Sequence, residues 1–244
     1  MARMLTLLKK KREIPICTAV IVAAGSSRRM GGIDKVLAPL GELPVIVHTL
    51  YVFQECSVIG DIIVVTRKDL IMEVSQLCQK YHLDKVTKVI VGGAERIDSV
   101  QAGLQEVDSK AKLIAIHDAA RPFLTQEILT DTVKKAAETG ASAPAVPITD
   151  TIKRVKNNLI FETLDRSQLY AVQTPQVFEA GLIRAAVSKA RADGAVLTDD
   201  CSAVERLGMR VSLIEGSREN IKITTQFDLL LGKTILNHRG KGGR

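Results

Sequence analysis

The sequence predicts an α/β fold with a mostly parallel, Rossmann-like sheet that is flanked by helices on both faces. Two observations point to this class. Apolar, β-prone runs alternate with helical patterns from residue 19 to residue 139, and such alternation is typical of parallel strands joined by helices. In addition, a Gly-rich loop directly follows the first of these runs, at the position where open α/β sheets bind their ligands.

The alternating part of the chain contains four strand-like runs and four helical patterns. The strand-like runs cover residues 19–24, 61–66, 88–91 and 113–116, and the helical patterns cover 44–55, 70–81, 98–104 and 125–139. Further along the chain, helices are predicted at 178–192, 201–207 and 225–237, and strands at 211–214 and 220–223. Thr198 or Asp199 is a suitable N-cap for the helix at 201–207.

One segment departs from the alternation and looks like a β-hairpin. Residues 151–155 and 159–163 form two short strand-like runs around Lys156-Asn157-Asn158, and asparagine tolerates the left-handed conformation that such turns need. We expect the hairpin to project from the domain as an arm of about residues 148–172. A role in gripping a second subunit is favoured over a simple decoration of the sheet edge.

Composition and charge indicate a globular protein without a nucleic-acid-binding surface. One domain, residues 17–238 including the arm, is the simplest division of the 244 residues. The net charge is +7, but eight cations lie in the first twelve and last six residues, within expected tails at 1–16 and 239–244; without them, 26 basic residues face 27 acidic ones. Aromatic residues make up only 3% of the chain, too few for a base-stacking platform.

Targeting and metal-binding signals are also weak. No apolar run approaches the roughly 18 residues that span a membrane, so we expect no membrane partner and a location in the cytoplasm. The four cysteines are widely spaced with no CxxC pair. Reduced, mostly buried thiols are therefore favoured over a disulfide framework or a structural zinc site.

The loop after the first strand-like run combines small residues with cations. It follows Ala23, Ala24 and Gly25, contains Arg29 and ends at Lys35. Small residues let backbone N–H groups approach an anion closely, and the two cations add full positive charge. A triphosphate-binding loop and a Gly-rich surface turn with solvated cations both fit these residues. The loop matches neither the Walker A pattern nor the GxGxxG dinucleotide pattern, which disfavours a P-loop protein and a dehydrogenase.

Polar residues that follow other strand-like runs should meet this loop along one edge of the sheet. Gly93 allows close backbone approach, and Ser99 stands at a helix start, which suits contact with a base or ribose. Asp118 is suited to hold Mg²⁺ against phosphates, although a lone Asp at a strand end is more often a cap or turn residue. Arg121 lies close to Asp118, and Arg166 and Lys222 are further cations beside strand-like runs, although each taken alone is more often a solvated surface charge. Several cations and a metal are what transfer from a nucleoside triphosphate requires.

Eight sequence motifs carry a family resemblance over nearly the whole chain, from residue 18 to about residue 236. They are AAGSSRRMGGIDK at 23–35, GGAERIDSV at 92–100, HDAARP at 117–122, DTIKR at 150–154, DR at 165–166, TPQ at 174–176, LTDD at 197–200 and NIKIT at 220–224. In this order they resemble the 2-C-methyl-D-erythritol 4-phosphate cytidylyltransferases of the non-mevalonate isoprenoid pathway.

The resemblance implies an activity and an assembly. It implies a nucleotidyltransferase fold of the glycosyltransferase-A type and transfer of CMP from CTP to 2-C-methyl-D-erythritol 4-phosphate (methylerythritol phosphate). The products would be 4-diphosphocytidyl-2-C-methyl-D-erythritol and pyrophosphate, formed by in-line attack on the α-phosphate. The resemblance also implies Mg²⁺ or another divalent cation as cofactor and a homodimer in which the arm reaches across to the other subunit.

The resemblance further implies roles for the residues that match the motifs. Arg29 and Lys35 would stabilise the charge on the α-phosphate and pyrophosphate, and Arg166 and Lys222 would position the attacking phosphate. Backbone groups would hold much of the cytidine, at Ala23, Ala24, Gly25, Gly93 and Ser99. Asp118 would lie near Mg²⁺ and the substrate hydroxyls. Arg121, Thr151 and Thr198 would complete the alcohol-phosphate pocket, and Thr151 and Arg166 would serve the partner's site.

Two departures from the family pattern and two alternatives stand beside this interpretation. Ala94 replaces a frequent Asp, which puts a side-chain contact to ribose or base in doubt, and Asp34 replaces a usual Pro beside the phosphate loop. A ribitol-5-phosphate cytidylyltransferase shares the fold and much of the CTP loop, but the motifs at 117–122, 150–154 and 220–224 favour methylerythritol phosphate. A non-catalytic nucleotide sensor is disfavoured because Lys35, Asp118 and the other matching charges are retained.

Overall fold

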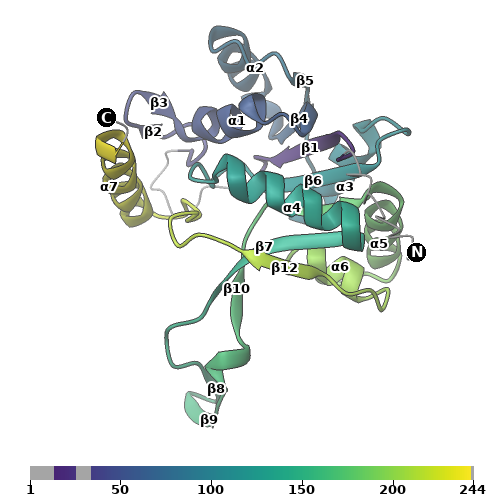
Figure 1. Cartoon of the computed structure of the whole chain (residues 1–244), viewed down its shortest axis with the longest axis vertical. Coiled ribbons are helices and arrows are strands. Elements are labelled where there is room, and N and C mark those ends of the chain that lie inside the picture. Colours follow the sequence, from purple (N-terminus) through teal and green to yellow (C-terminus); the bar gives the residue numbers. More distant parts are fainter. Residues whose placement is uncertain (1–13, 26–33, 243–244) are drawn as a thin grey trace, which may run out of the picture.

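The computed structural model describes residues 14–25 and 34–242, and an eight-stranded sheet runs through its centre (Figure 1). The strand order is β10-β7-β11-β6-β1-β4-β5, and β12 pairs with β7 outside this path. Neighbours in the half formed by β6, β1, β4 and β5 are all parallel, whereas β11 is antiparallel to β6 and β7, and β10 is antiparallel to β7. The predicted mostly parallel α/β class is therefore confirmed.

The strands of this sheet are short, as expected for a globular α/β domain. They are β1 Cys17–Val22, β4 Ile59–Thr66, β5 Val86–Val91, β6 Leu113–Asp118, β7 Ala141–Pro147, β10 Tyr170–Val172, β11 Gln176–Glu179 and β12 Ser212–Glu215. Two residue pairs, β2 Pro39–Leu40 and β3 Leu43–Pro44, form a separate small ribbon.

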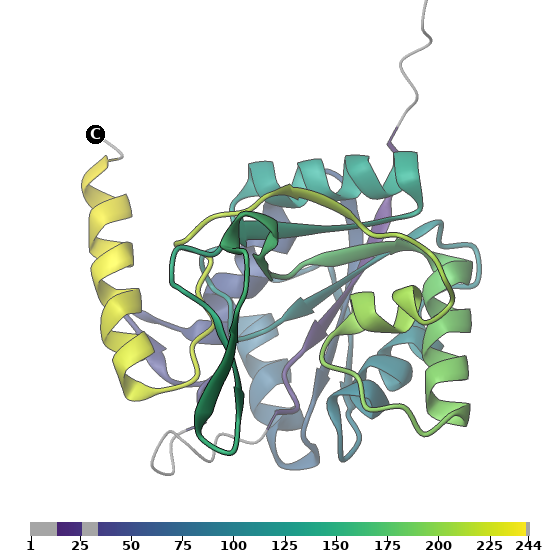
Figure 2. The same cartoon turned by 90° about the horizontal axis from the view of Figure 1, so that it is seen from below.

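Helices cover both faces of the sheet, as Figures 1 and 2 show. They are α1 Val45–Glu55, α2 Ile71–Lys80, α3 Arg96–Glu106, α4 Gln126–Thr139, α5 Ala180–Ala192, α6 Asp200–Glu205 and α7 Gln226–Gly242, with 3₁₀ turns η2 Lys68–Leu70 and η3 Arg166–Gln168. Buried side chains of α1, α2 and α4 share one apolar core, and those of α3, α5 and α6 share another. The sheet is thus the middle of three layers.

The register of β1 aligns the loops that follow the parallel strands. Val22 at the end of β1 lies beside Asp118 at the end of β6 and beside Val65 of β4, while Thr66 lies beside Val91 of β5. All four strands therefore end at the same edge of the sheet. This is the edge where open α/β sheets bind ligands.

The predicted hairpin is present and projects from the body. Strands β8 Lys153–Lys156 and β9 Leu159–Thr163 pair antiparallel with each other and with no strand of the main sheet. Asn157 and Asn158 have φ values of 49° and 60°, the left-handed conformation expected of this turn. In Figure 1 the hairpin extends far from the layers.

Several elements differ from the sequence prediction. Residues 220–223 are not a strand, because their backbone bonds to loops rather than to a sheet: Ile223 N donates to Ala120 O, and Asn220 O accepts from Arg121. The structure also has β7, β10 and β11, which were not predicted. The closing helix α7 extends to Gly242 and so includes most of the segment expected to be a C-terminal tail.

Across the ranges 14–25 and 34–242, no helix has both the length and the apolar character needed to cross a membrane.

Candidate active site

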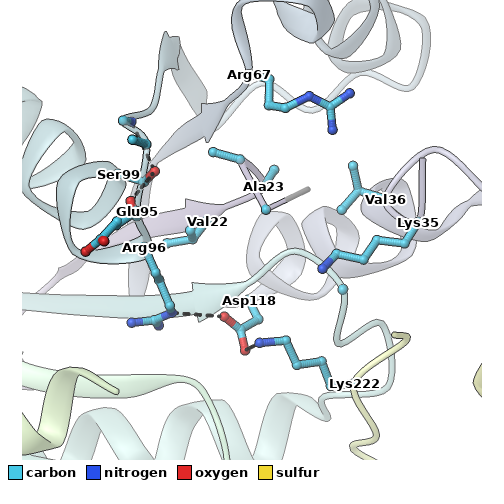
Figure 3. Close-up of a pocket in the computed structure, with 15 residues that line it drawn as sticks. Val22, Ala23, Lys35, Val36, Arg67, Glu95, Arg96, Ser99, Asp118 and Lys222 are labelled. Carbon is cyan, nitrogen blue, oxygen red and sulfur yellow. Dashed lines mark hydrogen bonds and ion pairs between the residues drawn. The ribbon is translucent and has the colours of Figure 1, made fainter. Parts of the chain in front are cut away.

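A cavity of about 380 Å³ opens at the carboxyl ends of β1, β4, β5 and β6 (Figure 3). Its described lining residues come from the loops after these four strands and from the segment before α7. They are Val22, Ala23, Ala24, Gly25, Lys35, Val36, Arg67, Gly93, Ala94, Glu95, Arg96, Ser99, Asp118, Ala120 and Lys222. Four of the described lining side chains are cationic and two are carboxylates, so the cavity favours an anionic ligand.

Asp118 is the carboxylate around which the cations gather. Lys222 Nζ lies 2.8 Å from Asp118 Oδ2, Arg121 Nε 3.6 Å from the same oxygen, and Arg96 Nε 3.5 Å from Oδ1. Figure 3 shows Asp118 between Arg96 and Lys222. Burial alone would raise the pKa of Asp118, but the charges of Lys222, Arg96 and Arg121 outweigh it and hold the pKa well below its usual range. Asp118 is therefore a carboxylate that stays ionised.

His117 and Thr174 fix the backbone at Asp118. The Thr174 hydroxyl accepts from Asp118 N at 3.1 Å, and its oxygen lies 3.0 Å from His117 Nδ1. Since the hydroxyl accepts from the amide, its proton is free to donate to Nδ1, which leaves the proton on Nε2 to reach Arg121 O at 3.2 Å. Burial lowers the pKa of His117 to about 4, which keeps the ring neutral. The neutral ring thus joins the end of β6 to the residue Arg121.

One side of the cavity is formed by small residues that approach one another closely. A Cβ atom on Gly92 would lie 2.7 Å from Ala24 Cβ and 2.6 Å from Ser99 Oγ, so only glycine fits there. Gly93 N donates to Ser99 Oγ at 3.2 Å, and Ser99 is 1% exposed. Ala23, Ala24, Gly25, Gly93 and Ser99 therefore all line the cavity, as the sequence predicts.

Lys35 lies against Gly25. A Cβ atom added to Gly25 would come within 3.3 Å of Lys35 Nζ, so the ammonium group lies beside the chain just after β1. Lys222 lies below Lys35 in Figure 3, next to Asp118. Two of the predicted cations are thus brought to one cavity from sequence positions almost 190 residues apart.

Arg96 is a functional candidate that the sequence reasoning missed. Its Nη1 and Nη2 donate to the two carboxylate oxygens of Asp200 at 2.7 and 2.8 Å, while its Nε faces Asp118. Asp200 is buried, at the start of α6. Arg96 therefore links the loop after β5 to the segment 197–200. Its position inside the GGAERIDSV motif was the signal that could have identified it.

The segment 220–222 is held to the cavity by Arg121. Its Nη1 donates to Asn220 O at 2.7 Å, and Asn220 Nδ2 donates to Thr174 O at 3.0 Å. Asn220 is fully buried. These bonds place Lys222 beside Asp118 without any sheet pairing. Arg121 thus supports the cavity, although it does not itself line it.

Besides Arg121, three predicted site residues within the described ranges do not line the cavity. Thr151 and Arg166 belong to the arm and are exposed, and Arg166 Nη1 donates to Thr149 O at 2.9 Å. Thr198 is exposed just before α6, where Asp199 is the N-cap and accepts from Ser202 N. Arg29 lies outside the described residues, so its prediction stays untested.

Asp118, the predicted metal ligand, is a single carboxylate at the wall of the cavity. Within the described residues, no group of three or more His, Cys, Asp or Glu side chains is placed to hold a metal ion. Mg²⁺, however, is commonly bound by one or two carboxylates together with substrate phosphates and water. Asp118, ionised and at the cavity wall, fits such a site.

Comparisons with known proteins agree on one family. The family model described as 2-C-methyl-D-erythritol 4-phosphate cytidylyltransferase (IspD) matches residues 17–238. Proteins of that name from Alkaliphilus metalliredigens and Bacillus cytotoxicus are each 44% identical, over 228 and 221 residues; the aligned regions cover 92% and 90% of this chain and 95% and 97% of the relatives. Among solved structures, the 4-diphosphocytidyl-2C-methyl-D-erythritol synthase of Anaerococcus prevotii has a TM-score of 0.82 at 29% identity, covering 91% of this chain and 96% of its own.

Proposed function

The chain belongs to the 2-C-methyl-D-erythritol 4-phosphate cytidylyltransferase family, and from this premise we propose how its cavity performs the transfer of a cytidylyl group to methylerythritol phosphate. The observation that carries the proposal is the convergence of Lys35, Arg96 and Lys222 on one cavity at the carboxyl ends of the parallel strands. Such a cavity offers positioning and charge stabilisation, which are the main requirements of nucleotidyl transfer.

In the proposed reaction, a phosphate oxygen of methylerythritol phosphate attacks the α-phosphorus of CTP. A bond forms between this oxygen and phosphorus while the bond to the bridging oxygen of pyrophosphate breaks on the opposite side. Cytidine lies against Ala24, Gly93 and Ser99, where the small side chains let it approach the backbone closely. Lys35 faces the charge that develops on the α-phosphate and on the leaving pyrophosphate, and the family resemblance implies the same role for Arg29.

The attacking phosphate is positioned on the side of the cavity that carries Lys222. Lys222 is held by Asp118 at 2.8 Å, so its ammonium group is already in place before the substrate enters. In this proposal Arg121 supports the alcohol-phosphate pocket through its bond to Asn220 O, and Thr198 would complete the pocket when the substrate binds. Preorganised charge of this kind lowers the barrier because little reorganisation is needed during reaction.

Asp118 is the residue that would hold Mg²⁺, with phosphate oxygens and water as the other ligands. When bound, the ion would neutralise charge on the triphosphate and favour departure of pyrophosphate. The chain's own contribution is a carboxylate that stays ionised because three cations surround it.

We also propose that the protein acts as a homodimer in the cytoplasm. The arm exposes an apolar tip: Leu159, Ile160 and Phe161 are 72%, 67% and 71% exposed. Exposed apolar patches of this kind mark interaction sites. Thr151 and Arg166 stand on the same arm, so in a dimer they would reach the cavity of the other subunit.

Two alternatives from the sequence gain no support. The relatives reported above are named for methylerythritol phosphate rather than ribitol 5-phosphate. The retention of Lys35, Asp118 and Lys222 in one cavity favours an enzyme over a nucleotide sensor.

Replacement of Lys35 by alanine tests the proposed chemistry. Removing a cation that acts on the transition state should lower kcat by about 10²-fold or more, with the melting temperature within a few degrees of the wild type. Release of pyrophosphate from CTP and methylerythritol phosphate measures the effect. Lys233→Ala, an exposed lysine of α7 outside the cavity, is the matched control and should retain wild-type turnover. A fully active Lys35→Ala protein would refute the role of Lys35.

A further inference from the structure

Asp34 is fixed in a turn directly before Lys35. Its Oδ1 accepts from Val36 N at 3.0 Å, and its backbone oxygen accepts from Leu37 N at 3.1 Å. Its Oδ2 accepts from the Nη1 of Arg67. The Asp34 side chain is only 11% exposed. One oxygen of the Asp34 carboxylate therefore accepts a bond within the turn, and the other binds Arg67 in the loop after β4.

Arg67 is itself held from two sides. It follows β4 directly and lines the cavity. Its Nε and Nη2 donate to the two carboxylate oxygens of Asp69 at 3.1 and 2.9 Å, while Nη1 donates to Asp34. Asp69 is 65% exposed, in contrast to Asp34. The contact with Asp69 is exposed to solvent and therefore weak, so Asp34 is the partner that ties the guanidinium group to the loop before Lys35.

These contacts fix Lys35 through both of its neighbours. Asp34 is tied to Arg67, and Val36 is 1% exposed, with its carbonyl accepting from Ile46 N at 2.8 Å. The backbone of Lys35 thus has little freedom, and its Nζ is directed over Gly25. A full negative charge next to a triphosphate site would oppose binding unless it is compensated, and Arg67 supplies the compensation.

We propose that Asp34, held by Arg67, is a positioning residue for Lys35 in nucleotidyl transfer. This inference rests on the proposed role of Lys35 at the triphosphate. An ion pair between two loops at the strand ends thus restrains the turn that carries Lys35. The ion pair acts without contact to the substrate, because it determines where the ammonium group of Lys35 points.

The inference predicts different kinetic effects for the two partners. Asp34→Asn keeps an acceptor for Val36 N but loses the charged tether, so kcat should fall about tenfold, the equivalent of roughly 1.4 kcal/mol, while KM for CTP stays within about twofold. Arg67→Met loses the tether and leaves Asp34 uncompensated, so kcat should fall similarly and KM for CTP should rise about fivefold.

The double variant gives the sharpest test. In Asp34→Asn/Arg67→Met the uncompensated charge is gone, so KM for CTP should return to within about twofold of the wild type while kcat stays as low as in either single variant. Asp69→Asn is the matched control, since it removes the other carboxylate partner of the same arginine; both kinetic constants should stay within about twofold. Arg67→Lys should recover part of the kcat lost in Arg67→Met.

Steady-state kinetics of pyrophosphate release, with melting temperatures for every variant, distinguish the outcomes. If Lys35→Ala is inactive while Asp34→Asn behaves as the wild type, the positioning inference fails and the proposed role of Lys35 stands. If Lys35→Ala is active, the proposed role itself fails. Equal losses in Asp69→Asn and Asp34→Asn, or additive kcat losses in the double variant, would also overturn the inference.

Discussion

At the scale of single residues, the cations at the cavity are already paired with carboxylates before a ligand arrives. Asp118 keeps three cations, Lys222, Arg96 and Arg121, within 2.8 to 3.6 Å. An incoming polyanion can share these cations without the rearrangement that scattered surface lysines would need. Arg67 is balanced in the same way by Asp34 and Asp69. Pairing inside the protein thus sets the direction of each cation.

His117 makes the stability of the folded protein depend on pH. Burial lowers its pKa from 6.5 to about 4, although the nearby Asp118 acts in the opposite direction. Between these two pH values the unfolded chain binds a proton that the folded protein does not. The free energy of unfolding should therefore decrease as the pH falls from about 6.5 to 4, by about 3 kcal/mol from this residue.

Denaturant unfolding at pH 7 and pH 4.5 tests this prediction on the wild type and on His117→Gln. The substitution should lower stability at pH 7, but the decrease between the two pH values should be smaller than in the wild type. Asp118 loses its contribution only below this window, because its pKa lies below its usual range. An identical decrease in both proteins would show that His117 does not titrate as the structure implies.

At the scale of elements, the strands and helices that could be predicted are those with a clear apolar periodicity in their own sequence. β1, β4, β6 and the helices between them carry strong apolar periodicity, and all were predicted close to their observed positions. β7, with the sequence ASAPAVP, has small residues and prolines in place of β-branched side chains, so its strand character comes from pairing with β11, β10 and β12. Residues 220–223 have a strand-like pattern but no strand beside them.

The arm is the element whose predicted function can be tested by subunit mixing. If Arg166 acts in the partner's site, a mixed dimer of Lys35→Ala and Arg166→Ala chains contains one intact site, made from the Arg166→Ala body and the Lys35→Ala arm. A co-purified mixed dimer should therefore recover about half of wild-type activity, although each variant alone is inactive.

The matched control for subunit mixing is a mixed dimer of Lys35→Ala and Lys222→Ala chains. Both substitutions lie in the body, so neither cavity is intact and no activity should return. Recovery of activity in both mixtures would mean that activity returns without the arm of one subunit completing the cavity of the other, and would contradict the predicted role of the arm. A wild-type protein that sediments as a monomer with full activity would contradict the shared site altogether.

At the scale of the whole molecule, the sheet explains which part of the site could be predicted. Lys35, Asp118 and Lys222 belong to motifs of the family and meet at one edge because the parallel strands end there. The contacts between them could not be predicted, since Arg67 reaches Asp34 and Arg96 reaches Asp200 across 33 and 104 positions. Such pairs depend on the register of strands and helices, which no local pattern determines.

The most direct test of the whole account is product formation by the purified wild-type protein. With CTP, Mg²⁺ and methylerythritol phosphate, it should release pyrophosphate and form 4-diphosphocytidyl-2-C-methyl-D-erythritol in equal amounts, and ribitol 5-phosphate should give little product. Turnover of ribitol 5-phosphate alone, or binding of CTP without any product from either alcohol phosphate, would contradict the account.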